Sequence, residues 1–117
     1  MVRIDKIIYM ITCFKSLASG LEDSQYSLYN KDILIDDNII RVLYRLGVIA
    51  DRTNTSRNQQ ELFKSIPLGR ESFLLSNTKK HSKEVCELTN PNCELCNMYI
   101  HCDYYNNKNI WVHKENI

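Results

Sequence analysis

Four cysteines lie within one short stretch of this chain, spaced Cys86-x6-Cys93-x2-Cys96-x5-Cys102. Thiols gathered this densely are typical of disulfide bonds, a tetrahedral zinc site or an iron–sulfur cluster. Each alternative requires the loop of residues 86–102 to fold back on itself until its sulfur atoms meet. The stretch therefore predicts one closed loop late in the chain, and the remaining sequence must fold so as to support it.

The surrounding sequence argues against some of these three roles for the cysteines but does not leave a single one. Disulfides need an oxidising compartment, and the opening residues MVRIDKIIYM lack the features of a cleavable secretory signal. Zinc ribbons usually carry two Cys-x2-Cys hooks a dozen or more residues apart, and only Cys93 and Cys96 form such a hook here. The spacings of bacterial and plant ferredoxins also differ from this one. The residues alone leave a four-cysteine metal site for either an iron–sulfur cluster or zinc.

Residues 4–18 have the period of an amphipathic helix. Their apolar positions recur at steps of three and four and are Ile4, Ile7, Ile8, Ile11, Phe14 and Leu17. A fifth cysteine, Cys13, lies far from the other four and is interpreted as a small buried apolar residue rather than a ligand. Residues 19–32 are rich in Ser, Asp and Asn without a clear period, so we expect a connecting loop there.

A second helix is predicted to begin at Asp36 or Asp37, either of which can cap it, and to end at Gly47. Its apolar stripe consists of Ile39, Ile40, Val42, Leu43 and Leu46. Arg41 and Arg45 lie one turn apart on one face of this helix. Paired arginines on a helix are more often solvated than bound to phosphate, so both are assigned to packing or to the surface.

Two further helices are predicted before the cysteines. A short one is capped by Thr55 or Ser56 and ended by Pro67. A longer one covers residues 68–85, with Leu74 and Leu75 predicted to point inward and Lys79, Lys80 and Lys83 outward. His81 and His101 lie near the cysteines in sequence. Because four thiols already complete a metal site, both histidines are interpreted as surface or hydrogen-bonding residues.

The composition fits one small all-α domain. A chain of 117 residues can bury a single core, and the predicted elements are all helices. The net charge of +1 provides no overall basic field. No apolar run approaches the roughly 20 residues of a membrane span. We expect a cytoplasmic or nucleoid-associated protein that is neither secreted nor embedded in a membrane.

Two segments resemble the helix-hairpin-helix DNA glycosylase superfamily, of the endonuclease III and adenine mismatch glycosylase type. The cysteine spacing, with Pro91 two residues before the second cysteine, is similar to the loop that binds a [4Fe-4S] cluster in those enzymes. The family also has a motif of valine, aspartate, any residue, asparagine or histidine, an aliphatic residue, any residue, arginine and valine. The residues here that resemble this motif are Ile35, Asp36, Asn38, Arg41 and Val42.

The resemblance implies the C-terminal part of a glycosylase fold, divided into a helical portion (residues 1–85), a cluster loop (86–102) and a C-terminal tail (103–117). The implied [4Fe-4S] ligands are Cys86, Cys93, Cys96 and Cys102. Asp36 would be the catalytic carboxylate, which stabilises the positive charge on the sugar of a flipped nucleotide as its base leaves. Without the resemblance, Asp36 is interpreted as a helix cap.

The chain also departs from the family pattern. The family's hairpin, written approximately as leucine, proline, glycine, any residue and glycine, is replaced by MVRID. A loose alignment of the helices places Lys6 near the lysine that attacks the sugar in family members with lyase activity; the alternative is a solvated lysine on the first turn. The loop ELTNPN carries no basic residue, so the candidates for contacts with DNA phosphates are Lys79, Lys80 and Lys83.

We therefore expect a DNA base-excision glycosylase, with or without lyase activity, that acts on a damaged or mismatched base in duplex DNA. The family's N-terminal half is missing, which implies a truncated protein or a separate chain that supplies it. The alternatives are a catalytically inactive iron–sulfur module that binds DNA and a zinc-binding interaction domain. In the tail, Tyr104, Tyr105 and Trp111 are expected to pack over the cluster and to shield it from water.

Overall fold

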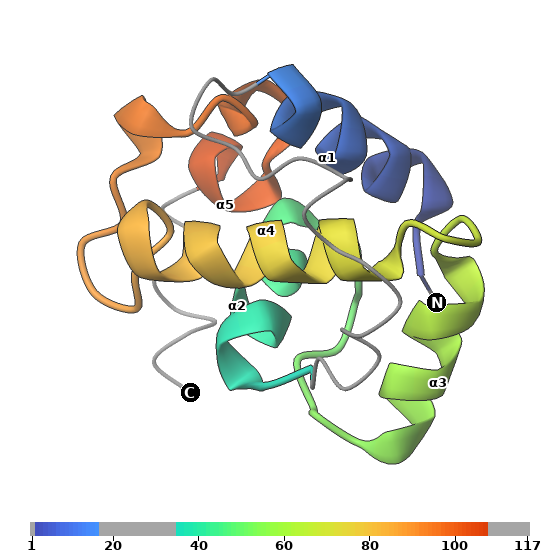
Figure 1. Ribbon diagram of the computed structural model, residues 1–117. Coiled ribbons are helices and arrows are strands. Elements are labelled where there is room, and N and C mark those ends of the chain that lie inside the picture. Colours follow the sequence, from blue (N-terminus) through green and yellow to red (C-terminus); the bar gives the residue numbers. More distant parts are fainter. Residues whose placement is uncertain (1, 17–34, 108–117) are drawn as a thin grey trace.

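The computed structural model describes residues 2–16 and 35–107 of the chain (Figure 1). Its longer helices are α1 (Ile4–Ser16), α2 (Asp37–Leu46), α3 (Ser56–Ser65) and α4 (Glu71–Glu84). Three short helical turns follow, namely η3 (Cys93–Leu95), η4 (Tyr99–His101) and α5 (Asp103–Asn106). Within the described residues the only sheet-like pairing is one antiparallel bridge between Val2 and Ile49. The prediction of an all-α chain is confirmed for these residues, and none of their helices has the length and apolarity to cross a bilayer.

Helix α4 crosses the centre of the molecule and packs against both α2 and α1 (Figure 1). One apolar core joins these helices, and its fully buried members include Ile7, Phe14, Ile39, Leu43, Leu62, Leu74 and Leu75. Met98 and Cys102 from the predicted cluster loop belong to the same core. The loop of residues 86–102 is therefore packed onto the helices.

Helix α1 buries a different part of its apolar stripe from the one that the sequence predicted. Its buried apolar residues are Ile7, Met10, Ile11, Cys13 and Phe14, which confirms the interpretation of Cys13 as a core residue. Ile4 and Ile8 are 55% and 47% exposed, so their predicted place in the core is wrong. At about 100° per residue, the buried face is centred on Met10 and Phe14, which leaves Ile4 and Ile8 at its edge. Leu17 and the predicted loop 19–32 lie outside the described residues.

Helix α2 has the two ends that its sequence predicted. Asp36 is the N-cap, and its Oδ1 accepts a hydrogen bond of 2.9 Å from the backbone N–H of Ile39. This contact decides between Asp36 and Asp37 as the capping residue. Gly47 ends the helix in the left-handed conformation, with a φ of 91°. All five residues of the predicted apolar stripe are buried.

Replacement of Gly47 by alanine is expected to lower the free energy of unfolding by about 2–4 kcal/mol. A left-handed φ disfavours any side chain, and a Cβ at Gly47 would collide with the side chains of Asp103 and Lys6. Gly69→Ala is the matched control, because Gly69 has a similar φ of 85° but no atom near its Cβ position. Urea unfolding should give Gly69→Ala a cost of only about 1–2 kcal/mol, from the backbone alone. Equal costs for the two variants would contradict the predicted collision.

Helices α3 and α4 follow the prediction with one shifted boundary. Thr55 caps α3, and its hydroxyl accepts a hydrogen bond of 3.2 Å from the backbone N–H of Asn58. Helix α4 begins at Glu71, three residues later than residue 68, because Gly69 adopts a positive φ in the turn before it. Leu74 and Leu75 are buried as predicted. Of the lysines predicted to point outward, Lys83 is exposed, whereas Lys79 and Lys80 are only half-exposed.

Candidate metal centre

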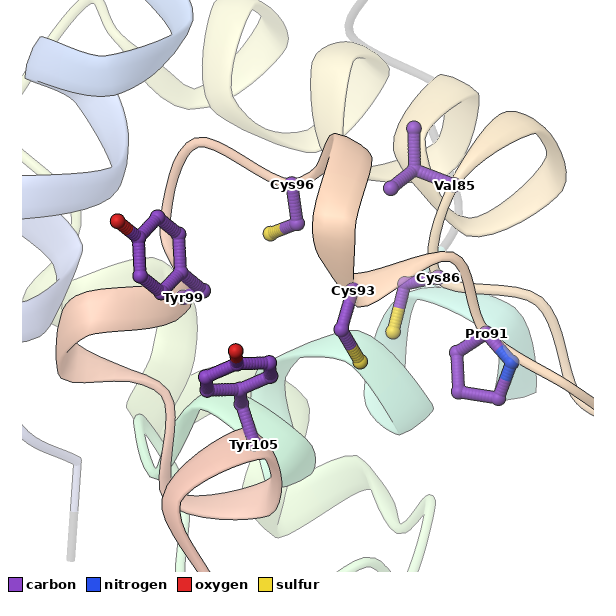
Figure 2. Close-up of a pocket in the computed structure, with 7 residues that line it drawn as sticks. All are labelled: Val85, Cys86, Pro91, Cys93, Cys96, Tyr99 and Tyr105. Atoms are coloured by element: carbon purple, nitrogen blue, oxygen red, sulfur yellow. The ribbon is translucent and has the colours of Figure 1, made fainter.

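Three of the four clustered cysteines line one pocket beside the end of α4 (Figure 2). They are Cys86, Cys93 and Cys96, and the rest of the wall is formed by Val85, Pro91, Tyr99 and Tyr105. The space at this pocket is about 240 Å³, which includes a part that is open to solvent. Its donors are all thiols, which as thiolates are the ligands of iron–sulfur clusters and of structural zinc. The residues therefore fit a thiolate-bound metal in donor type.

The fourth cysteine, Cys102, is buried, and its Sγ donates a hydrogen bond of 3.4 Å to the backbone carbonyl of Arg45. It lies close enough to Cys86 and Cys93 for charge on those thiols to raise its pKa further. Within residues 2–16 and 35–107, no three His, Cys, Asp or Glu side chains are arranged as ligands of a single ion. Coordination by all four cysteines therefore requires their side chains to reorient, and Cys102 to leave the carbonyl of Arg45.

Burial favours the neutral form of the thiols of Cys86, Cys96 and Cys102. It raises the pKa of Cys96 to about 12 and that of Cys102 to about 11, and the neighbouring cysteines add smaller upward contributions. Burial also raises the pKa of Cys86, although the guanidinium of Arg45 opposes this shift. Metals bind the thiolate form. Binding at this site therefore releases protons from thiols that are otherwise protonated at neutral pH.

Arg45 is buried beneath the start of the cysteine loop. The sequence assigned this arginine to packing or to the surface, and the structure shows that it is a packing residue. Its side chain is 1% exposed. The guanidinium donates hydrogen bonds to the Sγ of Cys86 at 3.4 Å, to the carbonyl of Glu87 at 2.8 Å and to the carbonyl of Leu88 at 3.1 Å. It also lies 4.8 Å from the centre of the Tyr104 ring. Arg45 thus fixes the first turn of the loop and faces one of its thiols.

Arg41 connects the first turn of α2 to the same part of the loop. Its Nη1 donates to Oδ1 of Asn38 at 2.8 Å, and its Nη2 donates to the carbonyls of Ser82 at 2.8 Å and Cys86 at 3.0 Å. Asn38, in the first turn of α2, is thereby linked through Arg41 to the first cysteine. Helix α2, the end of α4 and the start of the loop are therefore held together by one side chain.

Replacement of Arg45 by methionine in the metal-free protein is expected to lower the free energy of unfolding by about 2–4 kcal/mol, because hydrogen bonds from a buried guanidinium are lost. Arg45→Lys keeps the charge but not the planar fork, so it should recover less than half of that loss. Arg3→Met is the control, since Arg3 pairs with Asp5 at the surface and should change stability by less than about 1 kcal/mol. Urea unfolding measures all three, and an Arg45→Met protein as stable as Arg3→Met would contradict the prediction.

The two histidines of this region lie in different surroundings. His81 is buried, and its Nε2 lies 3.5 Å from the Sγ of Cys96. Burial lowers the pKa of His81 to about 4, so the ring is neutral at pH 7 and its Nε2 can face a thiol without adding charge. His101 is exposed and stacks edge-on against Tyr9 at 4.7 Å. The interpretation of His81 as a hydrogen-bonding residue agrees with this placement.

Asp36 faces a lysine that the sequence placed at the surface. Its Oδ1 is held by the N–H of Ile39, and its Oδ2 lies 3.5 Å from the Nζ of Lys79 on α4. The side chains of Asp36 and Lys79 are 35% and 44% exposed. The side chain of Lys79 is partly open to solvent, as the sequence predicted, and its amine turns toward α2. Lys80 is half-exposed and Lys83 exposed on the same helix, and all three contacts with DNA phosphates stay predictions.

Lys6 is buried, so its interpretation as a solvated residue is wrong. Its Nζ donates hydrogen bonds to the carbonyl of Leu46 at 2.5 Å and the carbonyl of His101 at 3.0 Å, and it pairs with Oδ1 of Asp103 at 2.9 Å. These three acceptors match the three donors of an ammonium group. A Schiff-base nucleophile needs a free amine. The contacts therefore favour a structural role, and a lyase role for Lys6 stays a prediction without a supporting contact.

The tail supplies one aromatic wall of the pocket and one support beneath Arg45. Tyr105 lines the pocket and packs edge-on against Tyr99, with ring centres 5.3 Å apart. Tyr104 lies under the guanidinium of Arg45. Trp111 lies outside the described residues. The placement of Tyr105 agrees with the predicted aromatic packing beside the cysteines, whereas Tyr104 packs on Arg45, and the shielding of a cluster stays a prediction.

Comparisons with known proteins provide no similar protein from which the role of this site could be inferred. No family model matches the chain, and neither a curated protein nor a solved structure is significantly similar to it. The function must therefore be inferred from the residues and contacts of the chain itself.

Proposed function

We propose that this chain is the cluster-bearing part of a helix-hairpin-helix type DNA glycosylase, which releases a damaged or mismatched base from duplex DNA. The observation that carries the proposal is the contact between its two motif segments. Arg41 donates one hydrogen bond to the side chain of Asn38, which follows Asp36 in the first motif. It donates another to the backbone carbonyl of Cys86, the first residue of the second motif. Two segments that are distant in sequence thus form one unit.

The metal centre has a structural part in this proposal. Cys86, Cys93, Cys96 and Cys102 are the residues that would hold a [4Fe-4S] cluster, which when bound supplies a cross-link between both ends of the loop. The loop contains only short helical turns, so it has few backbone hydrogen bonds of its own. Arg41 and Arg45 hold its first turn against α2 before any metal binds. The carboxylate of Asp36 and the loop would thereby be kept in fixed relation to each other.

Asp36 has the placement that a charge-stabilising carboxylate needs. It lies at the N-terminus of α2, and one of its oxygens is fixed by a backbone N–H. Its other oxygen is partly open to solvent beside Lys79. A fixed carboxylate of this kind stabilises the positive charge that develops on a sugar as its base departs. A nucleotide must leave the duplex stack to reach it.

Contact with DNA would depend on the lysines of α4. Phosphate affinity rises with the number of cationic side chains, and the loop of residues 86–102 has no lysine or arginine but carries Glu87 and Glu94. The lysines predicted to meet DNA phosphates all stand on α4, and one of them, Lys79, is paired with Asp36. So few contacts predict weak binding by this chain alone. We propose that a separate chain supplies the remaining DNA-binding surface.

A second candidate function is favoured by the outer face of the loop. Leu88, Leu95 and Ile100 are 69%, 72% and 60% exposed, and the loop of residues 86–102 has no lysine or arginine. Exposed apolar side chains on a metal-stabilised loop suit a protein-binding module. In this alternative the metal is zinc or an iron–sulfur cluster, and Asp36 serves only as the cap of α2.

The proposal is tested by metal analysis followed by a base-release assay. Protein purified without oxygen is analysed for iron, zinc and acid-labile sulfide, and about four iron and four sulfide per chain are expected. The loaded protein is then incubated with duplexes that each carry one oxidised, deaminated or mismatched base. Release of a free base from at least one duplex is the expected result. About one zinc per chain without sulfide, or no release from any duplex, would favour the protein-binding module instead.

A further inference from the structure

His81 stands against one of the pocket cysteines at the distance that separates two ligands of one zinc ion. Its Nε2 lies 3.5 Å from the Sγ of Cys96. A tetrahedral ion with a sulfur ligand at about 2.3 Å and a histidine nitrogen at about 2.0–2.1 Å keeps those two donors about 3.6 Å apart. A hydrogen bond between an imidazole and a thiol has a similar length, so the choice between the two roles depends on the other donors.

Counting His81 gives the region two hooks of potential ligands. His81 and Cys86 are separated by four residues across the end of α4, and Cys93 and Cys96 by two residues across η3. A backbone hydrogen bond closes each hook. The N–H of Cys86 donates to the carbonyl of His81 at 2.8 Å, and the N–H of Cys96 donates to the carbonyl of Cys93 at 3.1 Å. Structural zinc sites are typically built from two such hooks, with gaps of about two to four and about three to five residues.

Cys102 is the least available of the four clustered cysteines. It does not line the pocket, and its side chain is only 8% exposed. Its Sγ donates a hydrogen bond of 3.4 Å to the carbonyl of Arg45. A move into the pocket would take Cys102 out of the apolar core and break this bond. His81 needs no such move to meet Cys96, because its Nε2 already faces the thiol.

We infer that the pocket of the metal-free chain binds one zinc ion, while Cys102 stays in the core. The ligands are Cys86, Cys93, Cys96 and His81. Among the described residues no three such donors yet surround one point, so the ion draws the thiols of Cys86 and Cys93 toward the other two ligands. The inference goes beyond the proposed function and does not rest on it, because it assigns another metal and another fourth ligand. A cluster on four cysteines and this zinc ion are alternative occupants of one pocket.

The charge of this ligand set suits the surroundings of the pocket. Zinc with three thiolates and one neutral imidazole carries a single negative charge. The guanidinium of Arg45 is 1% exposed and lies 3.4 Å from the Sγ of Cys86, where it faces that charge. Zinc with four thiolates would carry a double negative charge in the same place, and its removal from water would cost more free energy.

Zinc titration of the full metal-free chain tests the fourth ligand. Affinity is measured by competition with a chromophoric chelator. A histidine that only hydrogen-bonds a ligand contributes about 10–100-fold in metal affinity, so we expect His81→Phe to lose more than about 100-fold. Cys102→Ser should stay within about tenfold of the unsubstituted chain. His101→Phe is the matched control, because His101 is exposed, and it should bind zinc as tightly as the unsubstituted chain.

Two further measurements decide the role of His81 without relying on the fold of His81→Phe. His81→Cys exchanges one ligand for another, so it should keep zinc affinity within about tenfold of the unsubstituted chain. Loaded with Co²⁺, it should show about one third more thiolate-to-cobalt charge-transfer absorbance, because a fourth thiolate joins three. In the unsubstituted chain, zinc should shift the imidazole nitrogen resonances of His81 and leave those of His101 in place.

The outcomes separate this zinc site from the proposed cluster. No zinc binding by the unsubstituted chain, an affinity of His81→Phe within about 100-fold of it, or unmoved His81 resonances would overturn the inference. Iron and sulfide uptake is measured in parallel on the same proteins. Cys102→Ser that binds zinc but assembles no cluster would support both sites. Zinc binding that depends on His81, with no iron or sulfide in any protein, would support the zinc site and reject the cluster. Zinc binding lost in Cys102→Ser and kept in His81→Phe would reject His81 and leave the cluster intact.

Discussion

An Asp36→Asn protein is expected to release bases at least about 100-fold more slowly than the unsubstituted chain, while keeping its fold and its metal. The neutral amide cannot stabilise a positive charge on the sugar, and it loses the ion pair with Lys79, whose Nζ lies 3.5 Å from Oδ2 of Asp36. The cap should survive, because asparagine caps helices about as well as aspartate and its oxygen can accept the N–H of Ile39. The measurement is single-turnover base release from a lesion duplex.

The matched control for this prediction is Asp37→Asn. Asp37 is exposed on the first turn of α2, and its Oδ1 accepts a hydrogen bond of 3.1 Å from the side chain of Asn54. The substitution removes the same charge one residue away, so it reports the general effect of charge near the helix N-terminus. Asp37→Asn should stay within a few-fold of the unsubstituted rate. If Asp36→Asn and the unsubstituted chain released bases at equal rates, the catalytic role of Asp36 would be rejected and only its role as a helix cap would remain.

Replacement of Cys93 or Cys96 by serine is expected to bring iron and sulfide from about four each per chain to nearly none. Both thiols line the pocket, and a serine hydroxyl is a poor substitute for a thiolate ligand. Loss of the metal removes the link between the ends of a loop that has only short helical turns. We therefore also expect a lower melting temperature and faster amide exchange within residues 86–102. The measurements are metal and sulfide analysis, thermal unfolding and hydrogen exchange.

Cys13→Ala is the control for the cysteine substitutions. Cys13 is buried on α1 as part of the apolar core, and it is not among the residues that line the pocket. Its replacement should cost a modest amount of packing energy and leave the metal content unchanged. If Cys13→Ala lost the metal as completely as Cys96→Ser, the ligand set would differ from the four clustered cysteines. If Cys96→Ser kept the full metal content, the proposed centre would be rejected.

Three buried or half-buried cations explain how an irregular loop can be held in place by the helices. Arg41 and Arg45 donate to the carbonyls of Cys86, Glu87 and Leu88 at the start of the loop. Lys6 donates to the carbonyl of His101 near its end and pairs with Asp103. Charged donors make stronger hydrogen bonds than neutral ones, so these contacts offset the lack of a regular backbone ladder. Both ends of the loop are thereby fixed from α1 and α2.

The sequence by itself determined the four longer helices and most of their ends. Periodic apolar residues predicted four helices, and local signals placed the end of α2 at Gly47 and narrowed two N-caps to Asp36 or Asp37 and to Thr55 or Ser56, of which the structure has Asp36 and Thr55. Such signals are readable because a cap satisfies backbone groups of its own helix within three or four residues. The close spacing of the cysteines likewise indicated a common site, and three of them line one pocket.

Only the tertiary structure decided what the cationic side chains do. Lys6, Arg45 and Lys79 all fitted an exposed face of their helices by sequence, yet Lys6 and Arg45 are buried and Lys79 turns toward Asp36. Their partners lie on segments that are 40 or more residues away in the chain, such as Cys86 for Arg45 and His101 for Lys6. A long charged side chain is buried only where distant acceptors satisfy it, and no local pattern of residues encodes those acceptors.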